Sequence, residues 1–136
     1  MQTAPAQLSP HGFDLLYGLE LIELGERHAR GRVGVREELK EPGGAVHGGV
    51  FAAIGGSLAT LASARAVSVQ GKAAAALSLQ TSLLRPITEG VIDATAVPRH
   101  QGRTTWVWEV EFADERGRLC ALCRVTVALR DGSGPV

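Results

Sequence analysis

The sequence has no excess charge, few cysteines and no long uninterrupted apolar run, and each absence narrows the possible functions. Its 136 residues include 14 Lys and Arg against 14 Asp and Glu, with no basic block or stripe, so nucleic acid is not an expected partner. No run of about 18 apolar residues is present, so no membrane span is expected. The polar, proline-containing start lacks the basic and apolar regions of a secretory signal.

The only two cysteines, Cys120 and Cys123, have the C-x-x-C spacing found in redox pairs and half zinc sites. They lie inside an alternating strand-like run rather than at a helix start, and no second pair or suitable His cluster completes a metal site. On an extended strand, residues three apart also point to opposite faces. We therefore expect two reduced structural thiols, no bound metal and a cytoplasmic protein.

The length predicts a single domain, which we place at residues 13–130 between a flexible N-terminal tail (1–12) and a C-terminal tail (131–136). A helix is predicted from Val46 to Val67, because this stretch is apolar and rich in alanine. Apolar residues recur along it at three- and four-residue spacing, which predicts one buried face.

Strand-like segments lie on both sides of this helix. A short helix over Phe13–Tyr17 and a hairpin precede it, and turn signals separate four strands after it. The predicted strands are Leu19–Leu24, His28–Glu37, Ala73–Leu84, Gly90–His100, Thr104–Ala113 and Leu119–Leu129. This order predicts an α+β fold in which an antiparallel sheet wraps around one long central helix.

Two sets of side chains alternate along the predicted strand Thr104–Ala113. Trp106 and Trp108 share one face and are expected in the core or an interface, with an aromatic wall for a ligand as the alternative. Glu109 and Glu111 share the other face and are expected to be solvated or to face a neighbouring subunit.

The most informative motif is His47-Gly48-Gly49, which opens directly into the apolar helix. The first turn of a helix presents backbone N–H groups without partners, at the positive end of the helix dipole. Glycine at this point lets a ligand oxygen approach the backbone closely. Such an arrangement suits an oxyanion hole for acyl transfer.

Several sequence features together resemble the hotdog-fold acyl-CoA thioesterases, in particular the 4-hydroxybenzoyl-CoA and phenylacetyl-CoA type. They are Val46-His47-Gly48-Gly49, Leu58-Ala59-Thr60, Thr81-Ser82, Arg85-Pro86, Thr104-Thr105-Trp106 and Gly117-Arg118-Leu119. The likeness runs without gaps from about Val46 to Arg130. It implies hydrolysis of an aromatic acyl-CoA to a free acid and coenzyme A, without a metal or redox cofactor.

The resemblance also assigns catalytic roles. The Gly48 N–H would polarise the thioester carbonyl, and His47 would shape the turn. The catalytic carboxylate belongs nine residues after the His, where this chain has Gly56. A side chain six residues before the His, Glu41 here, would orient the carbonyl or water, and Thr60 would support the water or the carboxylate.

For coenzyme A, the resemblance assigns phosphate contacts to Arg85, to the pair Arg103-Thr104 and, near the C-terminus, to Arg130. Guanidinium groups suit phosphate oxygens because they donate paired hydrogen bonds. The family's site lies between two subunits, so a homodimer is expected, and a homotetramer is the expected full assembly.

Gly56 is the main departure from the family pattern, and three explanations stay open. It replaces a Glu or Asp, the carboxylate has moved to another position such as Glu41, or the domain binds acyl-CoA without hydrolysing it. Close helix–sheet packing at Gly55-Gly56 is compatible with all three. Ser57 as a nucleophile is disfavoured, because it has no G-x-S-x-G context and no Asp or His partner in the sequence pattern.

The expected function is therefore an acyl-CoA thioesterase, impaired if Gly56 removes its only acid. The first alternative is a non-catalytic acyl-CoA-binding or sensing protein. The second is a hotdog hydratase or dehydratase, against which the His-Gly-Gly helix start without an acid argues.

Overall fold

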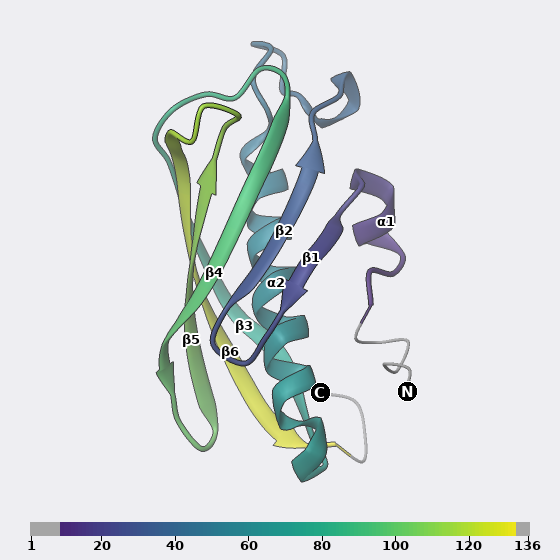
Figure 1. Ribbon diagram of the computed structural model, residues 1–136, viewed down its shortest axis with the longest axis vertical. Coiled ribbons are helices and arrows are strands. Elements are labelled where there is room, and N and C mark those ends of the chain that lie inside the picture. Colours follow the sequence, from purple (N-terminus) through teal and green to yellow (C-terminus); the bar gives the residue numbers. More distant parts are fainter. Residues whose placement is uncertain (1–8, 133–136) are drawn as a thin grey trace.

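A six-stranded antiparallel sheet curls around one long helix in the computed structural model, which describes residues 9–132 (Figure 1). The strand order is β1-β2-β4-β5-β6-β3. The helical elements are α1 (Phe13–Tyr17), the 3-10 turns η2 (Glu37–Leu39) and η3 (Ser68–Gln70), and α2 (Gly48–Val67). The strands are β1 (Glu20–Leu24), β2 (Ala29–Gly34), β3 (Lys72–Leu83), β4 (Val91–Gln101), β5 (Thr105–Ala113) and β6 (Leu119–Asp131). The predicted α+β architecture is confirmed.

Three boundaries differ from the sequence prediction by two residues or more. The second strand of the hairpin ends at Gly34 rather than Glu37, because the Val35 N–H donates to the carbonyl of Gly90 and the chain then forms η2. The central helix begins at Gly48 rather than Val46, since His47 occupies the N-cap position. Strand β6 continues to Asp131, one residue past the predicted end of the domain.

The core lies between α2 and the concave face of the sheet. Ile54 and Leu58 of α2 are fully buried. Opposite them, β5 turns its alternate residues inward, so Trp106 and Trp108 are core residues as predicted. The indole N–H of Trp108 donates to Ser63 Oγ at 2.8 Å and thus joins the sheet to the helix inside the core.

The two cysteines are free and buried. Cys123 faces α2, whereas Cys120 lies beneath the β5–β6 turn with its thiol donating to the Arg118 carbonyl at 3.2 Å. Burial raises the pKa of both thiols, so both stay protonated at neutral pH. Among residues 9–132, no group of three His, Cys, Asp or Glu side chains is placed to hold a metal ion.

The segment formed by α2 and η3, Gly48–Gln70, is long and apolar enough to cross a membrane by length and composition alone. Half of that window is buried inside the protein. Its apolar character is therefore accounted for by its place as the core helix under the sheet.

Strands β1 and β3 form the two edges of the sheet. The β3 edge is apolar on its surface: Leu77, Leu79 and Leu83 are each about half exposed. Native proteins normally protect a long strand edge of this kind with charge, proline or a covering segment.

Candidate active site

His47 builds the turn that begins α2. Its Nδ1 accepts a hydrogen bond from the Gly49 N–H at 2.8 Å, and its carbonyl accepts one from the Val50 N–H at 3.0 Å. The His47 N–H in turn donates to the Leu39 carbonyl at 2.8 Å. These contacts fit the supporting role expected for His47. Gly48 is the first residue of the helix, so its N–H has no partner within the helix.

Gly48 opens onto a pocket of about 330 Å³ at this end of the helix. The pocket brings together three of the predicted site residues, Glu41, Gly48 and Arg85. The rest of its lining is mostly apolar and consists of Ala45, Val46, Phe51, Leu83, Leu84 and Pro86. A Cβ on Gly48 would lie 3.0 Å from Leu83 Cδ1, so glycine keeps the approach to the backbone N–H open.

Glu41 is anchored in the loop before the helix. Its Oε1 accepts a hydrogen bond from the Ala45 N–H at 3.2 Å, and its backbone N–H donates to the Ala45 carbonyl at 2.8 Å. The carboxylate therefore holds the 41–45 loop closed next to Gly48. Glu41 thus lines the same pocket as Gly48, the residue whose N–H the resemblance assigns to the thioester carbonyl.

Gly56 and Thr60 lie further along α2, on a different pocket of about 320 Å³ between α1 and β3. Ala53, Gly56, Ser57 and Thr60 follow each other at helical spacing and form a half-buried face of small side chains. Leu79 borders this face from β3, and its Cδ2 is the atom nearest to a Cβ built on Gly56, at 3.1 Å. A side chain at position 56 would therefore require a small shift of Leu79, whose side chain is flexible and about half exposed.

Asp14 occupies the other side of this pocket, and sequence reasoning missed it. Its Oδ1 accepts a hydrogen bond from Ser57 Oγ at 2.6 Å and another from the Tyr17 hydroxyl at 2.8 Å. Asp14 and Ser57 are 43 residues apart, and no motif surrounds either of them. The fold alone brings a carboxylate into the pocket of Gly56, the position to which the resemblance assigns the catalytic acid.

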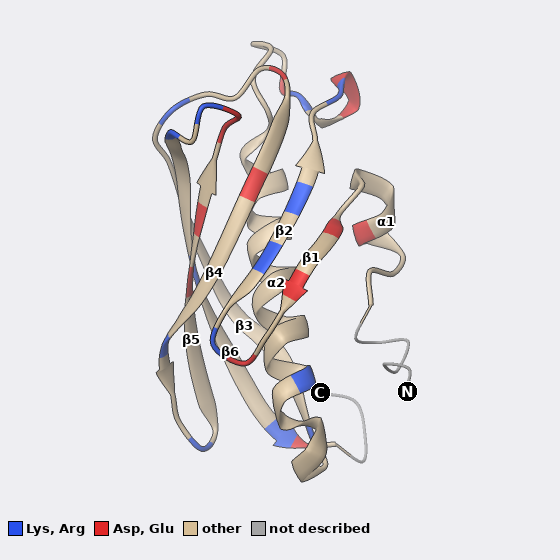
Figure 2. Ribbon diagram, in the orientation of Figure 1, with Lys and Arg blue, Asp and Glu red and all other residues tan. Residues whose placement is uncertain are grey.

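The basic residues expected to bind phosphates fall into two groups within one chain. Arg85 lies beside the Gly48 pocket, and its N–H donates to the Cys120 carbonyl near the start of β6. Arg103 and Thr104 form the exposed β4–β5 turn, and Arg130 is exposed near the end of β6. Figure 2 shows basic segments at both ends of the sheet. Ten residues of strand separate Cys120 from Arg130, or roughly 34 Å.

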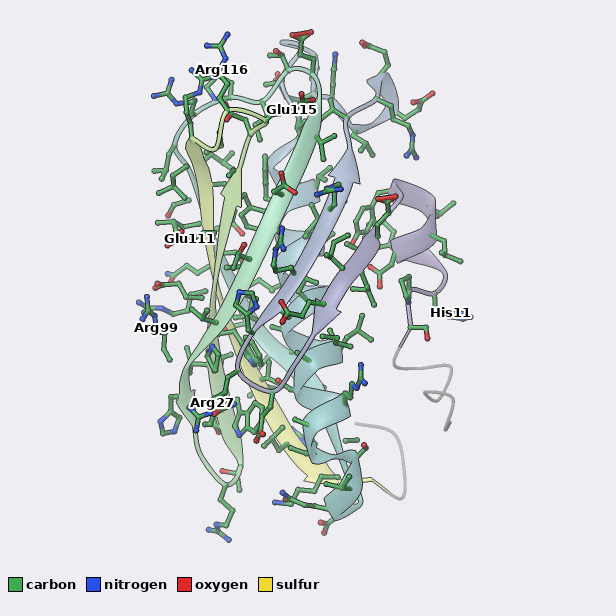
Figure 3. All side chains as sticks on the ribbon, in the orientation of Figure 1. His11, Arg27, Arg99, Glu111, Glu115 and Arg116 are labelled. Carbon is green, nitrogen blue, oxygen red and sulfur yellow. The ribbon has the colours of Figure 1, made fainter. Side chains whose placement is uncertain are left out.

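The outer face of the sheet holds ordinary surface charges. Glu109 pairs with Arg99 across β4 and β5, with a separation of 2.8 Å, and Glu111 is exposed. Figure 3 shows Arg99 and Glu111 projecting outward on the side of the sheet away from α2. Neither Glu109 nor Glu111 lines the Gly48 pocket or the Gly56 pocket described above.

Residues 43–121 match the Thioesterase superfamily model. The Mycobacterium tuberculosis protein Rv1847, provisionally assigned as an esterase, is 33% identical over 127 residues, which is 89% of this chain and 91% of that protein. Its solved structure superposes with a TM-score of 0.85 at 32% identity and covers 90% of this chain and 98% of that one. This chain belongs to the thioesterase superfamily.

Two further solved structures carry the same hotdog arrangement. Thioesterase HI1161 from Haemophilus influenzae has a TM-score of 0.80 at 28% identity, covering 87% of this chain and 82% of that chain. The Escherichia coli PaaI protein from the phenylacetic acid degradation operon has a TM-score of 0.75 at 27% identity, covering 84% of this chain and 80% of that chain. The hotdog fold expected from the sequence is therefore confirmed.

Proposed function

We propose that this protein is an acyl-CoA thioesterase that hydrolyses an aromatic acyl-CoA to the free acid and coenzyme A. The observation that carries the proposal is the Gly48 N–H, which stands at the start of an apolar helix and opens onto an apolar pocket with Arg85 at its edge. A thioester carbonyl placed there gains a hydrogen-bond donor aimed at the charge that develops in the transition state. The aromatic preference rests on the family resemblance and on Phe51, which lines the pocket.

The working unit in this proposal is a dimer formed along β3. The exposed leucines and open backbone of that edge suit pairing with a second copy of the same strand. Antiparallel pairing around a two-fold axis would bring the end of one β3 beside the start of the other. A Gly48 pocket would then face the partner subunit's Gly56 and Thr60, as the family resemblance implies.

The same pairing would bring Arg85 of one subunit close to Arg103 and Arg130 of the other. Lys72 begins β3 and its Nζ donates to the Arg103 carbonyl at 3.3 Å, while Ala73 pairs with Arg130. Arg103, Thr104 and Arg130 therefore lie near the start of β3. In the dimer these residues would approach the Arg85 of the other subunit and could share the phosphates of one coenzyme A.

A second candidate function is acyl-CoA binding without hydrolysis. Gly56 favours it, because a domain that keeps the oxyanion turn and the arginines but lacks the family's acid could hold a thioester intact. The two functions differ in turnover. A binding protein would take up coenzyme A thioesters and release no thiol.

The role of the Gly48 N–H can be tested by removing that single donor. Proline is tolerated at the first position of a helix and has no N–H. His47, the preceding residue, has φ −61° and ψ 137°, a conformation that proline accepts in its neighbour. Gly48→Ala is the matched control, because both variants place a Cβ against Leu83 and only the alanine variant keeps the N–H donor.

Thiol release from a panel of aromatic and aliphatic acyl-CoA thioesters would be measured for the wild type and both variants. We expect the wild type to prefer aromatic substrates. Gly48→Pro should lower kcat by ~100- to 1,000-fold relative to Gly48→Ala, the usual cost of losing one oxyanion donor. Equal rates for the two variants, or a wild type that binds substrates without turnover, would contradict the proposal.

A further inference from the structure

Beyond the thioesterase activity proposed above, on which this step rests, the geometry points to Asp14 as the general base that takes the place of the missing carboxylate at Gly56. Asp14 lines the same pocket as Gly56 and Thr60, the two positions to which the resemblance assigns the acid and its supporting hydroxyl. The carboxylate is thus supplied by α1 rather than by α2.

The backbone of α1 fixes where this carboxylate lies. The Asp14 N–H donates to the His11 carbonyl at 3.1 Å, and the Asp14 carbonyl accepts from the Leu19 N–H at 3.0 Å. Gly18 ends the helix in the left-handed conformation, with φ 85°. This turn directs the chain from α1 into β1 and holds Asp14 against α2.

Two hydroxyl groups orient the carboxylate, and both use the same oxygen. Ser57 Oγ and the Tyr17 hydroxyl each donate to Oδ1, at 2.6 and 2.8 Å. Burial, and after it the hydrogen bond to Asp14, raises the pKa of Tyr17, so its hydroxyl stays protonated and donates at neutral pH. Neither bond uses Oδ2, and no other side chain or backbone group of residues 9–132 donates to it, so Oδ2 can hold a water molecule in the pocket.

The pocket is also open enough for water and substrate to reach a base. Asp14, Gly56, Ser57 and Thr60 are all half-buried, so a water molecule can reach them and a thioester on a facing subunit can approach. Glu41 is less suited to the role of base, because it lines the pocket of Gly48 and not the pocket that contains Gly56 and Thr60. Glu41 remains suited to orienting the carbonyl.

In the resulting step, Asp14 Oδ2 removes a proton from water as the water oxygen bonds to the thioester carbon. The carbonyl oxygen gains the negative charge beside the partner subunit's Gly48 N–H. The carbon–sulfur bond then breaks as the carbonyl re-forms, and the leaving sulfur takes the proton from Asp14. One water is consumed, and a free acid and a thiol are released.

The decisive comparison is between the wild type and Asp14→Asn. Asparagine keeps an oxygen that accepts from Ser57 and Tyr17 but cannot take a proton at neutral pH. We expect kcat to fall by ~100-fold or more with KM little changed, because general-base help is worth ~100- to 10,000-fold. Asp93→Asn is the matched control: Asp93 pairs with Arg32 at 3.1 Å on the sheet, away from both pockets, and its removal should leave kcat unchanged.

A second variant separates catalysis from folding. In Asp14→Ala, added formate can enter the vacated space and act as the base. We expect formate to raise the rate of this variant by tenfold or more and to leave the wild-type rate unchanged. A purely structural Asp14 would lower the thermal midpoint and show no recovery with formate.

The results separate this inference from the thioesterase proposal. Wild-type kcat in Asp14→Asn, or no recovery of Asp14→Ala with formate, would overturn the role of Asp14 alone. An inert wild type together with an active Gly56→Glu variant would also overturn it, by showing that the site lacks a working base. If neither the wild type nor Gly56→Glu releases thiol, the thioesterase function and the role of Asp14 fail together.

Discussion

Gly55 lies so close to Cys123 that a Cβ at this position would be 3.1 Å from Sγ and 3.2 Å from Cβ of the cysteine. Cys123 is fully buried in the middle of β6. Close packing between helix and sheet therefore accounts for Gly55. Gly56 differs, because its nearest neighbour is the end of the flexible, half-exposed Leu79 side chain.

Alanine substitutions should separate the two glycines by stability. Both changes gain about 1 kcal/mol of helix propensity. Gly55→Ala also overpacks the core, which typically costs about 1–3 kcal/mol, so we expect it to be less stable than Gly56→Ala. Denaturant unfolding of the two variants measures the difference. Equal stabilities would show that packing does not require glycine at position 55.

Substitution of Arg85 should affect the binding of coenzyme A rather than the chemical step. Arg85→Ala should raise KM for acyl-CoA substrates about tenfold or more and change kcat little, because a phosphate contact is made equally in the ground and transition states. A thioester of N-acetylcysteamine, which lacks the phosphates, should be unaffected. The control is Arg99→Ala, since Arg99 points outward from the sheet (Figure 3). A loss of kcat on both substrates would assign Arg85 another role.

Acid should weaken the β5–β6 turn through Asp114. Burial by itself would raise the pKa of this carboxyl, but hydrogen bonds from the backbone and side chain of Arg118 and from the Arg116 N–H outweigh it and lower the pKa to about 2, from 3.8. Because the folded pKa is lowered, the stabilisation is complete above about pH 4 and is lost as the pH falls toward 2.

Asp114→Asn provides the comparison. Thermal melts should show the variant less stable than the wild type at pH 7, with the gap closing between pH 4 and pH 2. A gap that stays constant over this range would mean that the charge of Asp114 does not stabilise the turn.

The dimer edge can be tested with one charged substitution. Leu77 is 59% exposed on β3, and Leu77→Arg should halve the mass measured by light scattering, because it places a charge in the proposed interface. Ile22 is 46% exposed on β1, the opposite edge of the sheet. Ile22→Arg should leave the mass unchanged. Dissociation by Ile22→Arg alone would place the subunit contact at β1.

Much of the fold follows from local patterns in the sequence. The alternation of Trp106 and Trp108 with polar residues predicts a strand with one buried face, and the His47-Gly48-Gly49 turn predicts where the helix begins to within two residues. The end of β2 is harder to predict from the sequence, because the Val35 N–H donates to the carbonyl of Gly90, a loop residue 55 positions away. Such contacts have no local signal.

The candidate site was only partly predictable for the same reason. Gly48, Glu41 and Arg85 meet at one pocket as expected, since they lie at the same end of α2 and β3. Asp14 was missed because its partner Ser57 is 43 residues away and a lone Asp in a short helix has no spacing pattern. The separation of Arg85 from Arg103 and Arg130 likewise becomes apparent only once the register of β3 and β6 is known.

Thiol release from 4-hydroxybenzoyl-CoA and phenylacetyl-CoA, measured side by side for the wild type and Gly56→Glu, tests the central claim most directly. If the chain is a complete thioesterase as it stands, the wild type turns over and Gly56→Glu gives no gain beyond about tenfold, since the site already has a base. A wild type that binds these substrates without releasing thiol, beside a rapidly hydrolysing Gly56→Glu variant, would contradict the account.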